Sequence, residues 1–284
     1  MTAAGPVHPL HLGDVAVKRA NVVGRGTPML AWTFLSHRWT APLPVWAFVI
    51  EHPAGAVLWD AGQDPRCAER GYFPGGLVGA VYRHQVRPRV APSQTLEAQL
   101  AAAGMSLDDI RLVAVSHLHY DHAGNLPLLA GRPVFVSEAE HALATGKDPH
   151  LHGILHDRLD LGRVDLRPIA FAPVGGVVGG VVDDIFGGAH DLHGDGSLLL
   201  VPTPGHSPGS MSLLVHRDGE APLLLVGDAT YDAARLADPA VPDVGDRAAQ
   251  RATNERIVRL RDALGGLRVI AAHDPRAPHL LAGA

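Results

Sequence analysis

The sequence is poor in residues on which several protein classes depend. Among its 284 residues Cys67 is the only cysteine, which excludes an internal disulfide and a metal cage of thiolates. Lysine occurs only as Lys18 and Lys147, and arginine supplies the rest of the 24 basic side chains. These arginines are spread along the chain and the formal net charge is −5, so we expect no nucleic-acid partner.

Long hydrophobic runs are missing as well. No stretch reaches the roughly 18 uninterrupted apolar residues of a membrane span. The apolar segment 174–182 is broken by four glycines, which predicts a loop. Residues 1–13 show no basic segment followed by an apolar one, so no signal peptide is evident. We therefore expect a cytoplasmic protein with no membrane partner.

What the chain does contain is enough apolar material for one sizeable core, with 46% hydrophobic residues. Short apolar runs that end in turns predict buried strands at 45–51, 56–59, 112–116, 134–137, 198–201, 211–216, 223–226 and 269–272. Helical patterns lie between some of them, at 93–103, 138–144 and 246–264.

This order of elements predicts one α/β domain over residues 1–284, built as an αββα sandwich of two mixed β-sheets flanked by helices. A doubly wound sheet is the alternative, but no Gly-x-Gly-x-x-Gly turn follows an early strand. The glycine-rich segment 171–196 is expected to form a long loop or an irregular hairpin near the site. The chain could be a monomer or a homodimer.

Histidine is the residue present in excess, with 18 copies. Four of the groups suited to metal binding follow one strand directly, namely His117, His119, Asp121 and His122. Buried polar side chains need partners, so four of them this close together require water or a metal ion as a shared partner. The spacing suits one ion held by His117 and His119, with a second held by Asp121 and His122.

Three more candidate ligands follow other predicted strands: His206, Asp228 and His273. Each alone is more often a cap or a solvated loop residue. Together with the first run they make five histidines and two aspartates at strand ends, which suits two ions sharing one carboxylate. Nitrogen and oxygen ligands favour zinc, with iron, manganese or cobalt as alternatives.

These motifs resemble the metallo-β-lactamase superfamily. The resemblance rests on His-Leu-His-Tyr-Asp-His at 117–122, Thr-Pro-Gly-His at 203–206, Gly-Asp at 227–228 and the late histidine at 273. Within the superfamily the chain resembles the N-acyl-homoserine lactone lactonases, to which the spacing of Asp228 and Tyr231 is the more specific pointer. The resemblance implies the αββα fold.

The same resemblance implies a ligand assignment. One metal would be held by His117, His119 and His206, and the other by Asp121, His122 and His273, with Asp228 bridging the two. Asp60 would support the ligand loops, although a plain turn residue explains it equally well. Asp121 and Tyr231 are the expected catalytic residues: Asp121 would help to hold a hydroxide shared by the metals, and Tyr231 would stabilise the oxyanion.

The function so implied is a metal-dependent hydrolase that opens the lactone ring of N-acyl-homoserine lactones and so quenches bacterial signalling. A small acyl-lactone or ester would be its substrate. A same-fold esterase, thioesterase or organophosphate hydrolase remains the alternative. A non-catalytic ligand-binding protein is disfavoured because all seven ligands are present.

Several residues outside the ligand set have both a functional and a plain structural interpretation. Segments 29–34 and 72–73 could line a groove for an acyl chain, but plain core or surface packing explains them better. Solvation likewise explains His150, His152 and His156 better than a further metal site does. Cys67 lies far from every motif and is expected to be a passive small residue.

Overall fold

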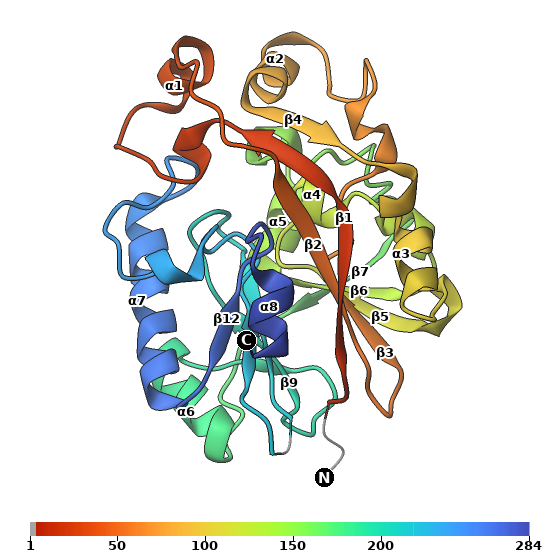
Figure 1. The fold of residues 1–284 in the computed structure, drawn as a ribbon, viewed down its shortest axis with the longest axis vertical. Helices are drawn as coiled ribbons and strands as arrows, with labels where there is room; N and C mark the ends of the chain where they lie inside the picture. Colours follow the sequence, from red (N-terminus) through yellow and green to blue (C-terminus); the bar gives the residue numbers. More distant parts are fainter. Residues whose placement is uncertain (1–3, 218, 284) are drawn as a thin grey trace.

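The computed structural model describes residues 4–217 and 219–283. It contains two mixed β-sheets packed face to face with helices on the outside, as the order of elements predicted (Figure 1). The larger sheet has seven strands in the order β4-β1-β2-β3-β5-β6-β7, and the smaller has five in the order β12-β11-β10-β9-β8. The αββα sandwich is therefore confirmed.

The strands of the larger sheet are β1 (Val7–Val17), β2 (Leu43–Ile50), β3 (Ala56–Trp59), β4 (Val86–Arg89), β5 (Ile110–Ala114), β6 (Pro133–Ser137) and β7 (Asp165–Ile169). Those of the smaller sheet are β8 (His190–Asp191), β9 (Leu198–Pro202), β10 (Met211–Val215), β11 (Leu223–Leu225) and β12 (Arg268–Ile270). Strands β3, β5, β6 and β7 run parallel, as do β11 and β12. Each predicted strand is present, with its ends displaced by at most a few residues.

The helices are α1 (Met29–Leu35), α2 (Gly76–Gln85), α3 (Leu96–Ala102), α4 (Tyr120–Ala123), α5 (Glu138–Ala144), α6 (Val177–Phe186), α7 (Arg247–Ala263) and α8 (Ala277–Ala282). Helix α7 begins where Asp246 accepts hydrogen bonds from the amides of Ala248 and Ala249. The three predicted helices correspond to α3, α5 and α7. Strands β1, β4, β7 and β8 and helices α1, α2, α4, α6 and α8 were not predicted.

Successive side chains along each strand point to opposite faces of the sheet, so the core is built in layers. Val57 and Trp59 of β3 point between the two sheets, where they meet side chains from β9 and β10. Leu58 points the other way, into a cluster that Leu96 and Leu100 of α3 cover. Because both faces of the central strands are buried, these strands appear in the sequence as continuous apolar runs.

The prediction of a loop at 174–182 is wrong, because α6 occupies most of this segment. Val182 and Phe186 of this helix pack in one cluster with residues of β9 and α7. This burial outweighs the low helix propensity of glycine. At Gly179 a side chain would not fit, since an added Cβ would lie 2.8 Å from Cγ2 of Val174. None of the helices in the described part is long and apolar enough to cross a bilayer.

Candidate metal centre

The run from His117 to His122 leaves the C-terminal end of β5 and changes direction within a few residues. His119 has extended backbone angles and precedes α4, whose single turn carries Asp121 and His122. The change from extended to helical backbone separates the first two histidines from the last two ligands. The sequence thereby presents two pairs of ligands from one short segment.

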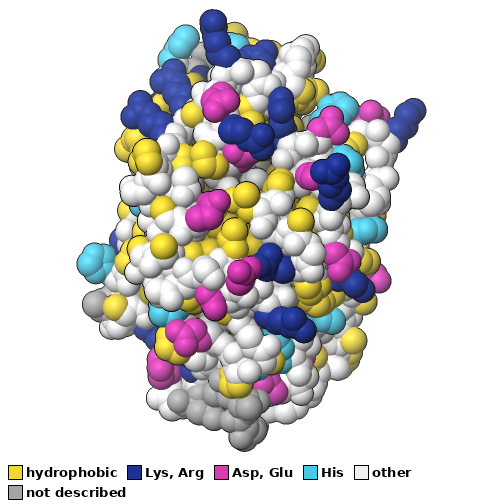
Figure 2. Space-filling view, turned by 90° about the vertical axis from the view of Figure 1, so that its right-hand side faces the viewer, with side chains coloured by type: hydrophobic (Ala, Val, Ile, Leu, Met, Phe, Trp, Pro, Cys, Tyr) yellow, Lys and Arg dark blue, Asp and Glu magenta, His cyan; other side chains and the backbone are white. Residues whose placement is uncertain are grey.

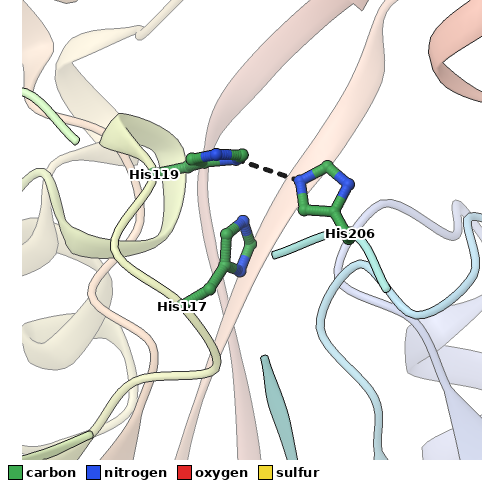
Figure 3. Close-up of side chains that lie close together, drawn as sticks. All are labelled: His117, His119 and His206. Atoms are coloured by element: carbon green, nitrogen blue, oxygen red, sulfur yellow. Dashed lines mark hydrogen bonds between the residues drawn. The ribbon is translucent and has the colours of Figure 1, made fainter. Parts of the chain in front are cut away.

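The remaining candidates follow β9, β11 and β12, and all of them meet the run from β5 at one edge of the sandwich. His206 joins His117 and His119 in a set whose ligand atoms lie within 4.8 Å of one another (Figure 3). Nε2 of His206 lies 3.0 Å from Nδ1 of His119. Three imidazoles converging in this way can hold one metal ion.

A second set lies beside the first and consists of Asp121, His122 and His273, again within 4.8 Å. Nε2 of His273 lies 3.7 Å from Oδ2 of Asp121. His273 is oriented by its other ring nitrogen, Nδ1, which donates a hydrogen bond of 2.8 Å to the carbonyl oxygen of Pro44. Two imidazoles and a carboxylate make a second potential metal-binding set.

Asp228 lies between the two sets and presents one oxygen to each. Its Oδ1 is 3.2 Å from Nε2 of His122 and 3.3 Å from Nε2 of His273. Its Oδ2 is 3.4 Å from Nε2 of His206 and accepts a hydrogen bond of 3.0 Å from the hydroxyl of Tyr231. The structure thus brings all seven predicted ligands and Tyr231 together.

Buried polar atoms without partners indicate that these residues fit a metal. Nε2 of His117, Nε2 of His122 and Oδ1 of Asp228 are buried and form no hydrogen bond of good geometry with a described residue, although the last two atoms lie 3.2 Å apart. Leaving such atoms unpaired is costly, and a divalent cation would pair with all three. The donor set of imidazole nitrogens and carboxylate oxygens suits a divalent transition metal.

The protonation states of the histidines also suit metal binding. Burial lowers the pKa of His117 well below its usual range and that of His206 to about 3. Both imidazoles are therefore neutral near pH 7, as metal ligation requires. Burial opposes a charge on His122, but the carboxylates of Asp228 and Asp60 outweigh it and raise the pKa of His122 well above normal. The negative charge that holds a proton on His122 would also attract a metal ion, which must displace that proton to bind the ring.

Asp60 orients the second set rather than serving as a plain turn residue. Its carboxylate accepts hydrogen bonds from Nδ1 of His122 at 2.8 Å and from the amide of Ser116 at 2.7 Å. The bond to His122 turns Nε2 of that ring toward Asp228. Asp60 has a positive φ of 58°, a conformation that aspartate tolerates better than most residues.

Two supporting contacts had no signal in the sequence. The buried carboxylate of Glu140 accepts hydrogen bonds from the amide of Leu118 and the hydroxyl of Ser207, which belong to two different ligand loops. The carbonyl oxygen of His152 accepts a hydrogen bond of 3.2 Å from Nε2 of His119, which leaves Nδ1 to face His206. A buried glutamate at the start of a helix resembles any capping residue, so only the fold reveals its role.

A cavity of about 1200 Å³ adjoins the centre. Asp121, Asp228 and Tyr231 lie at its wall, and most of the remaining wall is apolar, including Met29 and Leu30 of α1. Plain packing was the favoured interpretation of segment 29–34, but its first two residues, Met29 and Leu30, line the cavity.

The other interpretations of the residues around the site agree with the structure. Segment 72–73 is not among the lining residues and packs in a buried cluster with Cys67 and Tyr120. Burial raises the pKa of the Cys67 thiol, as expected of a passive residue. His150 and His152 lie at the cavity, but neither they nor His156 belong to any metal-binding set among the described residues.

The fold and the two ligand sets define a metallo-hydrolase type of centre, and comparison with known proteins identifies the family. Residues 40–273 match the family model described as the metallo-beta-lactamase superfamily. The chain belongs to this superfamily.

Individual proteins within the superfamily that are similar to this chain include lactonases. The chain is 31% identical over 239 residues to the N-acyl homoserine lactonase AttM of Azorhizobium caulinodans, with 83% of each chain covered. Its fold matches a solved N-acyl homoserine lactone hydrolase with the product N-hexanoyl-L-homoserine at its catalytic metal centre, with a TM-score of 0.75, 22% identity and coverage of 98% and 96%. It also matches AidC, a dizinc quorum-quenching lactonase, with a TM-score of 0.65, 16% identity and coverage of 95% and 87%.

Proposed function

We propose that this chain is a dinuclear metal-dependent hydrolase that opens the lactone ring of N-acyl-homoserine lactones. The observation that carries the proposal is the position of Asp228, with one oxygen toward each ligand set and with Tyr231 bonded to the second oxygen. The relative from Azorhizobium caulinodans bears the name of this activity, which supports the choice of substrate class.

The proposed metals are two divalent ions, with zinc first because histidine and carboxylate ligands suit it. One ion would be held by His117, His119 and His206, and the other by Asp121, His122 and His273, with Asp228 as the shared ligand. When bound, such a pair of ions lowers the pKa of a coordinated water toward 7 and polarises a carbonyl group.

The side chains of the chain contribute positioning and hydrogen bonding. Asp228 lies between the two sets and Asp121 beside His273, so their carboxylates can orient the attacking water. Burial, reinforced by the charge of Asp228, raises the pKa of the Tyr231 hydroxyl well above its usual range. Tyr231 therefore stays protonated at neutral pH, and its hydroxyl can turn from Asp228 to donate its one hydrogen bond to the oxygen on which negative charge develops.

The cavity beside the centre would bind the acyl chain of the substrate. Its wall beside α1 and α2 is apolar, with Leu30, Val78 and Val81 among the lining side chains. An acyl chain bound there would bury its methylene groups, each worth about 0.8 kcal/mol. The lactone would then lie at the metal end, next to Tyr231.

The test is a substrate panel with the metal-loaded enzyme, measured by proton release at constant pH. The panel contains N-hexanoyl-homoserine lactone, a thioester of the same acyl chain and a phosphotriester. The proposal predicts that turnover of the lactone exceeds that of the other two by at least an order of magnitude. Turnover of the thioester or the phosphotriester without turnover of the lactone would contradict it.

A further inference from the structure

The positive charges of this acidic protein are concentrated around the two helices beside the cavity. Residues 15–50 and 70–96 contain no aspartate or glutamate at all. We call the part of these segments around α1, α2 and β4, residues 18–39 and 70–89, the cationic cap. It contains seven exposed arginines: Arg19, Arg25, Arg38, Arg70, Arg83, Arg87 and Arg89. Seven of the 22 arginines, which are far apart in the sequence, therefore lie together at one end of the folded chain.

The cap also exposes large apolar side chains. Leu35 of α1 is 76% exposed, Leu77 of α2 is 64% exposed and Leu30 of α1 is 52% exposed. Helix α1 contains no charged residue, and both Phe34 and Leu35 face solvent. Exposed apolar side chains clustered near arginines that form no ion pair with a described residue are typical of a surface that contacts another molecule.

The two helices form one continuous surface. Nε2 of Gln85 at the end of α2 donates a hydrogen bond of 2.7 Å to the hydroxyl of Thr33 in α1. The rings of Phe34 and His84 lie 5.0 Å apart, centre to centre. Both helices lie at the top of the molecule with β4 (Figure 1), and Lys and Arg side chains gather with hydrophobic ones at the same end (Figure 2).

Two of the acidic groups near the cap, Asp243 and Asp14, are already engaged, while the exposed Glu69 lies next to Arg70 at its edge. The carboxylate of Asp243 is buried, binds the amides of Arg25 and Gly26 and pairs with Arg247, a residue outside the cap. Asp14 of β1 pairs with His11 and accepts a hydrogen bond from Gln94. Neither carboxylate forms an ion pair with a guanidinium of the cap, so the surface keeps its positive charge.

We propose that the cationic cap docks on an anionic phospholipid surface. Arginines that reach lipid headgroups each add about a fivefold gain in binding, and leucine and phenylalanine side chains enter the interface below them. A duplex nucleic acid would engage the arginines but would leave the leucines and Phe34 in water. The mouth of the apolar cavity lies between the same helices, because Met29, Leu30, Leu77 and Val78 line it.

Docking in this orientation would bring the cavity to the surface into which long-chain acyl substrates partition. This consequence rests on the proposed function, whereas the docking itself does not. Docking is therefore measured without substrate, so that a failure of either proposal can be recognised separately.

The experiment is vesicle flotation of the full chain at low salt. Vesicles of equal parts phosphatidylglycerol and phosphatidylcholine are compared with vesicles of phosphatidylcholine alone. We expect the protein to float with the anionic vesicles only, and to be released by high salt because salt screens the arginines. Equal flotation with both vesicle types, or with neither, would overturn the proposal.

Variants in the cationic cap and matched control variants elsewhere test whether the cap is the surface that binds the vesicles. The double variant Arg19→Glu/Arg38→Glu is expected to weaken binding to anionic vesicles more than tenfold, whereas Arg259→Glu near the end of α7 should leave it unchanged. Leu35→Ser is expected to weaken it several-fold, and Val177→Ser on α6, where the side chain is 90% exposed, should not. Cap and control variants that bind alike would overturn the proposal.

Two further outcomes would assign the cap to another occupant and so also overturn the proposal. One is a wild-type dimer in sedimentation that Leu35→Ser converts to a monomer, with no flotation, which would point to a second copy of the chain. The other is tighter binding to duplex DNA than to the anionic vesicles at the same salt. Circular dichroism and the thermal midpoint of each variant establish that the comparison is between folded proteins.

Discussion

The hydroxyl of Tyr231 donates a hydrogen bond of 3.0 Å to Oδ2 of Asp228. The ring of Tyr231 also stacks on His273, with centroids 5.0 Å apart and an interplanar angle of 18°. One residue therefore contacts the carboxylate between the two ligand sets and a histidine of the second set. This arrangement fixes the phenol at the point where the cavity meets the centre.

Removing this hydroxyl should impair turnover but not metal binding. For Tyr231→Phe we expect kcat on N-hexanoyl-homoserine lactone to fall about 100-fold, the usual effect of losing one hydrogen-bond donor to a developing oxyanion. The metal content should match that of the wild type, because the stacked ring is retained. Steady-state kinetics with metal analysis of the same sample would check this, and unchanged kcat would remove Tyr231 from the mechanism.

Asp60 should increase metal affinity indirectly, through its hydrogen bond to His122. Asp60→Asn keeps the shape and tolerates the positive φ, but it weakens the acceptor for Nδ1 of His122. We expect metal affinity to fall about 10- to 100-fold, measured by competition with a chromogenic chelator. Asp64→Asn is the matched control, since Asp64 caps a neighbouring turn and pairs with Arg66. Equal losses in both variants would show a general structural effect instead.

Glu140 should stabilise the two ligand loops that it joins. In Glu140→Ala the amide of Leu118 and the hydroxyl of Ser207 lose their acceptor inside the protein. We expect the free energy of unfolding to fall by about 2 kcal/mol or more, measured by urea denaturation of the metal-free chain. Glu138→Ala on the exposed side of the same helix should cost far less. A similar, small loss in both variants would contradict the role assigned to Glu140.

Asp243 should affect long-chain substrates selectively. Its carboxylate holds the amides of residues 25–26, just before α1 supplies Met29 and Leu30 to the cavity wall. Asp243→Ala should loosen this wall and raise KM for N-decanoyl-homoserine lactone about tenfold, which corresponds to 1.4 kcal/mol. KM for the butanoyl substrate should change little, because its chain is too short to reach the wall. An equal rise for both substrates would show that the ligand loops themselves had moved.

The sequence predicted which side chains the fold brings together, because the candidate ligands follow the ends of buried strands. Four apolar runs end shortly before these ligands, and the pairing of their strands brings the ends to one edge. His206 and His273 could therefore be named as candidate ligands of one site although 66 residues of chain lie between them.

Other features depend on tertiary contacts that no local pattern encodes. Helix α6 forms despite the glycines in its sequence, because Val182 and Phe186 pack against residues of β9 and α7. Glu140 acquires its role only when two loops meet above it. The cap shows the same limit, because arginines far apart in sequence, such as Arg19 and Arg87, are brought together by the pairing of β1 with β4.

The most direct test of the central claim, that Asp228 is shared by two metal ions, is a count of metal ions per folded chain. The chain is loaded with zinc, desalted and analysed by plasma mass spectrometry, alongside Asp228→Ala and His273→Ala. The account predicts two ions in the wild type, at most one firmly held ion in His273→Ala, and loss of lactone opening in both variants. A single ion in the wild type, or two ions and full lactonase activity in Asp228→Ala, would contradict it.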